Sequence, residues 1–227
     1  MQTQFSHQLI QALSAERLNA YRGRLAPTAS EREVLGRYAW NMALSESLYP
    51  SLQLLEITLR NTIHRAASTE FGQAYWFDSA GVLQHNHERD AISKAKATLT
   101  QQHKPLDANR IVAEVNFGFW TSLLDRRYEQ TLWPRLLKPA FPHMPRQQRT
   151  RANLSKRFHR VRQLRNRVFH HEPIWHWHDL AQQHHDILEA ISWIEPAARN
   201  LVTLVDRFPA VHTQGAAPLE IALRPFC

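Results

Sequence analysis

The chain has 227 residues, which is enough for one large domain or two small ones with a buried core. It carries 28 Lys and Arg against 20 Asp and Glu, so its formal charge is +8. This basic balance indicates a polyanionic partner such as nucleic acid, a nucleotide or an anionic membrane. The one cysteine, Cys227, excludes an intrachain disulfide and a cysteine zinc site, and the 6 glycines argue against glycine-rich phosphate loops.

The N-terminal residues 1–22 mix polar and apolar side chains at helical spacing, which does not fit a signal peptide. No window approaches the roughly 18 uninterrupted apolar residues that a membrane span requires. We therefore expect a cytoplasmic protein with no membrane partner.

Apolar residues recur at helical spacing almost throughout the chain. The pattern predicts helices over residues 4–21, 30–49, 51–70, 88–102, 108–115, 146–171 and from 180 onward, with Pro50 ending the second. Ser30 and Glu33 form a predicted capping box, Asp107 and Asp179 are predicted N-caps, and Pro196 should kink the last helix or start a new one. The prolines between 134 and 145 predict a loop.

No long window alternates with period two, so the sequence predicts an all-α fold: a single-domain bundle of about seven to nine helices. We expect an N-terminal helix and loop over residues 1–29, the helical domain over 30–207, and an irregular C-terminal tail over 208–227.

The predicted helix 146–171 concentrates positive charge, because it carries nine cations and no acid. A solvated helix face normally mixes both signs to form pairs four residues apart, and this helix has no acid to offer. It is therefore a candidate RNA-binding surface, although a solvated face remains the alternative. The candidate RNA-binding residues are Arg149, Arg151, Lys156, Arg157, Arg160 and Arg162.

Arg165 lies within the apolar stripe of this helix, between Phe158 and Val161 on a helical wheel. An arginine in that position must be paired, for example with a buried Glu56, or must line a cleft or an interface.

Asn166, His170 and His171 follow Arg165, and together they suit RNA cleavage without a metal or other cofactor. The 2′-OH attacks the neighbouring phosphorus, a histidine manages the proton, and the arginine fork stabilises the charge that develops on the phosphorane. Asn166 could orient the phosphate or the histidine. The alternative is that the histidines merely close the end of a helix.

The segment Arg162-Gln-Leu-Arg165-Asn166-Arg-Val-Phe-His170-His171-Glu-Pro-Ile174 resembles the signature of the Abi-like (abortive infection) proteins of the HEPN superfamily. Its Arg165 and His170 fit the Arg-x4-6-His motif of that superfamily. Further similarities, in family order, are Leu55-Glu56-Ile-Thr-Leu-Arg60-Asn61, Asn116-Phe-Gly-Phe-Trp120, Leu132-Trp133-Pro134, Ala140-Phe-Pro142 and Ile191-Ser-Trp-Ile-Glu-Pro196.

This resemblance implies a HEPN-like helical bundle that acts as a metal-independent endoribonuclease, in phage defence or as a toxin. It implies a homodimer whose two Arg/His motifs face one cleft. HEPN members without nuclease activity exist, so a non-catalytic RNA- or nucleotide-binding helical module is the alternative. The sequence names neither the RNA target nor an antitoxin partner.

One geometric condition applies to the motif. Residues five apart in an ideal helix lie about 140° apart, so Arg165 and His170 would not share a face. They could cooperate if the helix loosens before Pro173, or if Arg165 of one chain works with His170 of another. His171 is a secondary catalytic candidate.

Three other features have competing interpretations. Glu56 could orient Arg165 or a histidine, or could simply pair with Arg60 four residues on. The histidines at 170, 171, 176, 178, 184 and 185 could bind a transition metal, but their spacing fits no recognised site, and we predict no metal. Aromatic residues such as Phe117 and Trp120 could stack on bases, but their apolar neighbours favour a core position.

Overall fold

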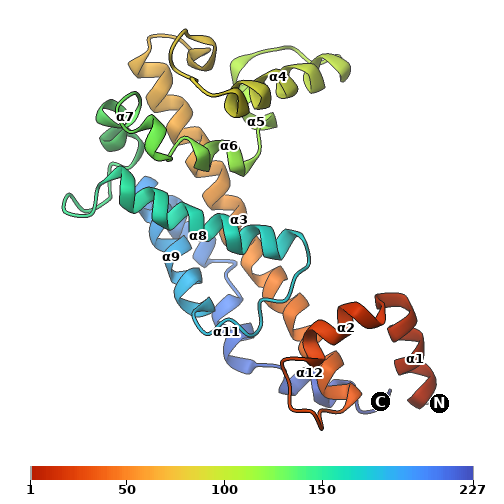
Figure 1. Ribbon diagram of the computed structural model, residues 1–227. Coiled ribbons are helices and arrows are strands. Elements are labelled where there is room, and N and C mark those ends of the chain that lie inside the picture. The colour runs from red at the N-terminus through yellow and green to blue at the C-terminus, as the bar shows by residue number, and fades with distance from the viewer. Residues whose placement is uncertain (1, 227) are drawn as a thin grey trace. The chain divides into compact units, whose positions relative to one another are not determined.

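The computed structural model describes residues 2–226 and is helical throughout (Figure 1). Within that range it has twelve α-helices, two 3-10 helices and no strand, which confirms the all-α fold class and exceeds the expected number of helices. The chain forms two compact units rather than one. The first unit contains the residues up to 51, 164–185 and those from 205 onward; the second contains 52–163 and 186–204. Segments from both chain ends belong to the first unit, and the expected boundaries at 29/30 and 207/208 stay a prediction.

The first unit contains four short helices of its own: α1 (Gln2–Leu13), α2 (Ala15–Arg22), α11 (Phe208–Gln214) and α12 (Ala217–Ala222). It also holds parts of three longer helices, α3 (Glu31–Glu70), α8 (Arg151–Phe169) and α9 (Leu180–Ile194). The single helix expected over 4–21 is interrupted at Ser14, whose φ is 67° and whose hydroxyl accepts the Arg17 backbone N–H. Leu18, Tyr21, Val34 and Leu35 form the buried core of this part.

The C-terminal tail is helical, so the expectation of an irregular segment over 208–227 is wrong for its described residues. Pro209 and Pro218 occupy the first turns of α11 and α12, where a missing N–H has no helical partner to lose. Gly36 lets the Glu220 side chain approach α3 closely, because a Cβ at Gly36 would lie 2.3 Å from Glu220 Cγ.

The second unit holds the remaining elements. They are η1 (Trp76–Asp78), α4 (Asn86–Gln101), α5 (Ala108–Glu114), α6 (Phe117–Ser122), η2 (Arg126–Tyr128), α7 (Trp133–Ala140) and α10 (Pro196–Thr203). Its core is aromatic: Phe117, Phe119, Trp120 and Tyr128 are all at most 2% exposed, which confirms the core interpretation over base stacking. Glu88 is fully buried there and accepts hydrogen bonds from Arg127 and the Tyr128 hydroxyl.

Two proline-based predictions were wrong. The segment 134–145 begins with α7, because Pro134 occupies its first turn. α3 does not end at Pro50 but continues through it, and the whole helix is 40 residues long. Leu48 and Leu52, one turn apart across Pro50, are buried, and this packing offsets the hydrogen bond that a proline removes.

The capping predictions at Ser30 and Asp107 were correct, and Asp179 directly precedes α9 and accepts a hydrogen bond from the Gln183 side chain. Ser30 and Glu33 exchange hydrogen bonds at the start of α3, and the Asp107 carboxylate caps α5. Pro196 starts α10.

Candidate functional site

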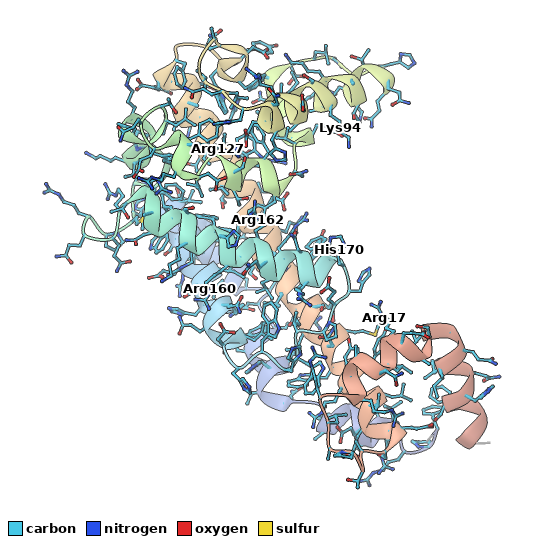
Figure 2. The ribbon with its side chains drawn as sticks, viewed as in Figure 1. Arg17, Lys94, Arg127, Arg160, Arg162 and His170 are labelled. Atoms are coloured by element: carbon cyan, nitrogen blue, oxygen red, sulfur yellow. The ribbon has the colours of Figure 1, made fainter. Side chains whose placement is uncertain are left out.

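The Arg–His segment, residues 165–171, covers the last turn of α8 and the two residues after it, within the first unit. Figure 2 shows His170 at this end of the helix. His171 adopts the left-handed conformation, with φ at 56°. The Glu172 N–H donates to the Arg167 carbonyl at 2.8 Å, and the His171 N–H donates to the Val168 carbonyl at 3.1 Å. These two bonds define a Schellman motif, which usually has glycine at the position that His171 occupies.

The helix remains regular as far as His170. The His170 N–H donates to the Asn166 carbonyl at 2.9 Å, which is the ordinary bond between residues four apart. The irregular backbone starts only at His171, too late to bring His170 onto the face of Arg165. The helix therefore does not loosen before His170, so its backbone does not turn the two motif residues onto one face.

Arg165 is half-buried and lies over an aromatic ring. Its Cζ is 4.3 Å from the centroid of the Phe169 ring, one turn further along α8. Phe169 is 39% exposed and contacts the ring of Tyr49 on α3 at a centroid distance of 5.8 Å. Stacking on Phe169 restricts the guanidinium group and keeps it next to exposed aromatic surface. Asn166, His170 and His171 are exposed.

A buried asparagine fixes the loop that follows the motif. Asn41 on α3 is 3% exposed, and its Oδ1 accepts the backbone N–H groups of Ile174 at 2.7 Å and Trp175 at 3.2 Å. Its Nδ2 donates to the Glu172 carbonyl at 3.4 Å. Sequence reasoning missed this residue, although a polar side chain among the apolar residues of a helix is a usable signal.

Arg17 on α2 is a second contact that the sequence did not suggest. Its Nη2 donates to the carbonyl of His171 at 2.6 Å (Arg17 and His170 are labelled in Figure 2). A charge-assisted hydrogen bond to this carbonyl stabilises the left-handed residue from outside α8. No local pattern could have found it, because the two residues are 154 positions apart in sequence.

Several of the candidate RNA-binding cations make internal contacts in the second unit. Arg149 donates to the Met144 and Pro142 carbonyls, and Arg151 donates to the Leu124 carbonyl at 2.9 Å. Arg157 donates to the Asp186 carbonyl at 2.8 Å, pairs with Glu189 at 2.8 Å, and lies over the Trp193 ring. The acids that the basic helix lacks are therefore supplied by α9, which runs beside α8 in this unit (Figure 1).

The other three candidates are more accessible. Lys156 is exposed and makes no ion pair or hydrogen bond within residues 2–226. Arg160 is 40% exposed and lies 3.7 Å from the Asp186 carboxylate. Arg162 has Thr121 Oγ1 at 3.4 Å and His159 Nδ1 at 3.1 Å as partners. Fewer of these cations are therefore accessible to a ligand than the sequence suggested.

Glu56 belongs to the second unit, whereas Arg165, Asn166, His170 and His171 belong to the first. Near Glu56 on α3, the Arg60 Nε donates to the Asn61 side chain at 3.3 Å. His64, a further turn along, accepts a hydrogen bond from the Trp76 indole at 3.0 Å. Burial lowers the pKa of His64, which fits a structural histidine.

The dense histidines do not form a metal site in the described part of the chain, where no three His, Cys, Asp or Glu side chains converge. His184 stacks on Phe208 at a centroid distance of 4.4 Å, and its Nε2 lies 3.1 Å from Asp206 Oδ2. Burial lowers the pKa of His184, although the Asp206 carboxylate acts in the opposite direction. This histidine therefore packs inside the first unit.

No family model, curated protein or solved structure matches the chain. The Abi-like and HEPN assignment consequently stays a prediction. Across residues 2–226, none of the helices combines the length and apolar character needed to cross a bilayer.

Proposed function

We propose that the protein is a metal-independent endoribonuclease of the HEPN type, acting in phage defence or as a toxin. The observation that carries this proposal is the end of α8. There an arginine stacked on Phe169 is followed by two exposed histidines, the second held in a left-handed conformation. A histidine in place of the usual glycine at this position is strained, and strain of order 1–3 kcal/mol is one of the features found at functional sites.

In the proposed reaction, His170 takes the proton of an RNA 2′-OH as the 2′-oxygen attacks the adjacent phosphorus. The bond to the 5′-oxygen breaks, and that oxygen leaves with a proton from the imidazolium. The planar guanidinium group of Arg165 donates hydrogen bonds to the phosphorane oxygens, and Asn166 orients the phosphate. The products are a 2′,3′-cyclic phosphate and a 5′-hydroxyl, and no metal takes part.

The active form in this proposal is a homodimer, in which Arg165 of one copy works with His170 of the other. Its support is the regular helix that separates the two residues, together with exposed apolar side chains beside the motif. Met42, Tyr49 and Phe169 are 60%, 49% and 39% exposed. Apolar residues exposed together on one unit are typical of an interface.

Light scattering at micromolar concentration should report a dimer, and Tyr49→Glu should shift it to a monomer and reduce cleavage. A purely monomeric wild type that still cleaves RNA would contradict the dimeric site.

The test of activity incubates the pure protein with total RNA in EDTA. Cleavage should persist, its products should carry 2′,3′-cyclic phosphate ends, and DNA or RNA with a 2′-O-methyl group at the cut site should resist. RNA binding without cleavage under any condition would favour the non-catalytic RNA- or nucleotide-binding module. Cleavage only with added divalent metal would exclude the proposed mechanism.

A further inference from the structure

A pocket opens in the first unit directly beside the Arg–His segment. Its volume is about 460 Å³, and its lining includes Arg17, Tyr21, Tyr38, Met42, Ser45 and His171. These residues come from α2, from α3 and from the Schellman motif that ends α8. Pockets that bind small organic groups begin at roughly 300 Å³, so this one is large enough for a single nucleotide.

The polar groups of the pocket have unused hydrogen-bonding capacity. Ser45 Oγ is buried and has no hydrogen-bond partner among the described residues. Arg17 uses one N–H for the His171 carbonyl, which leaves most of its guanidinium donors available. A buried hydroxyl without a partner costs free energy unless a ligand or water satisfies it. A purely apolar ligand would not satisfy it.

The other walls of the pocket are formed by two tyrosine rings and a flexible methionine side chain. The rings of Tyr21 and Tyr38 contact each other at a centroid distance of 5.2 Å, and Met42 is 60% exposed. Tyr21 is 1% exposed and supports Tyr38 from the core, whereas the half-buried Tyr38 ring and the exposed Met42 can contact the face and the edge of a nucleobase. An arginine next to such walls suits the phosphate attached to the base.

We propose that this pocket receives one nucleobase of the RNA strand next to the cleaved linkage, with Ser45 reading the edge of the base and Arg17 holding its phosphate. The position follows from the chain itself, because His171 lines the pocket and directly follows His170. The inference rests on the proposed ribonuclease function and gives it a sequence preference. Ser45 and Arg17 act as specificity-determining residues and take no part in proton transfer.

The first experiment maps cut positions in a mixed-sequence RNA. Wild type should prefer one base at a fixed distance from the cut, and Ser45→Leu, which also fills the pocket, should abolish that preference. Ser45→Ala, which removes only the hydroxyl, should reduce the preference about tenfold, the value of one lost hydrogen bond. Ser68→Leu is the matched control, because Ser68 is also on α3 with a buried, unpartnered hydroxyl but lines no described pocket. Cut positions that are identical in wild type and Ser45→Leu would overturn the proposal.

The second experiment measures binding and does not depend on cleavage. The His170→Ala variant, with and without Ser45→Leu, is titrated with fluorescent RNA pentamers that contain an abasic nucleotide at each position in turn. One abasic position should weaken binding about tenfold, and only when Ser45 is present. This result would support the pocket even if no RNA were cut. If free nucleoside monophosphates bind in a Ser45-dependent way but no abasic position matters, the pocket takes a free nucleotide and the RNA-base proposal is wrong.

Discussion

Arg157 and Arg165 belong to the same basic helix, α8, but the two stretches around them differ in what their side chains contact. In the basic segment, residues 149–162, the guanidinium groups of Arg149, Arg151 and Arg157 contact carbonyl oxygens, and Arg157 also pairs with a neighbouring carboxylate. In the Arg–His segment, the histidines stay exposed and the backbone is left-handed. A high density of cations therefore marks a structural role in one stretch and a candidate chemical role in the other.

The contrast has a physical origin. A guanidinium group can donate to several backbone carbonyls and still pair with an acid, so these arginines connect short helices and loops in addition to the buried aromatic core. An exposed imidazole at a helix end gives the fold little packing. Side chains whose position is not explained by packing are the better candidates for function.

The largest expected effect is the loss of RNA cleavage on substitution in the Arg–His segment. His170→Ala should reduce RNA cleavage about 10²–10⁴-fold, the usual contribution of general acid–base catalysis. Arg165→Lys should be almost as inactive, because an ammonium group cannot replace the bidentate fork. Initial rates on one defined RNA measure this, and circular dichroism should show that both variants stay folded. If either variant unfolds while His171→Ala alone abolishes cleavage, the site assignment is one residue off and Arg165 is structural.

The next largest effect concerns the free energy of unfolding and is expected in the basic segment. Arg157→Ala removes the ion pair with Glu189, the hydrogen bond to the Asp186 carbonyl and the contact with Trp193, so it should lower the free energy of unfolding by about 2–4 kcal/mol. Lys156→Ala, at the adjacent exposed position, should change it by less than about 0.5 kcal/mol. Urea denaturation of both variants makes the comparison. Equal stability of the two would mean that the α8–α9 ion pairs contribute nothing.

The sequence predicted the helical class and some helix ends from residues whose effect is local. Ser30, Glu33 and Asp107 cap helices through their own neighbours, so their role could be read in advance. The prolines misled for a related reason, because Pro134 and Pro209 are as suitable for the first turn of a helix as for a loop.

Long-range contacts explain what the sequence could not provide. Asn41 forms hydrogen bonds with the loop at 172–175, and Arg17 forms one with His171. In each case the two partners are more than a hundred residues apart in sequence. The acids that pair with Arg157 are on another helix, so a search for partners four residues away could not find them. Arg165 and His170 could be proposed from the sequence because their residue types and spacing suit the predicted chemistry, and their role stays a prediction.

A smaller effect tests whether the side chain of His171, whose backbone has a strained positive φ, contributes to RNA cleavage. His171→Gly should stabilise the fold by about 1 kcal/mol, because glycine adopts positive φ without a Cβ clash. His103→Gly is the matched control, because His103 also has a positive φ, 54°, in a Schellman motif after α4. Both variants should gain stability in urea denaturation. Cleavage should fall only for His171→Gly if this side chain contributes to the reaction, and equal activity of the two would remove His171 from the site.

The smallest effect concerns the salt dependence of RNA binding, and it tests which cations face the RNA. Each phosphate contact contributes about 0.7 to the slope of log affinity against log salt for a single strand. Lys156→Gln should therefore flatten the slope by about that amount, because its ammonium group is exposed and makes no contact in the described chain. Arg149→Gln should leave the slope nearly unchanged, because its guanidinium donates to the Met144 and Pro142 carbonyls. Fluorescence anisotropy at four salt concentrations measures both slopes. A flatter slope for Arg149→Gln alone would show that this arginine exchanges its carbonyl contacts for phosphate on binding, and that the basic segment binds RNA as the sequence predicted.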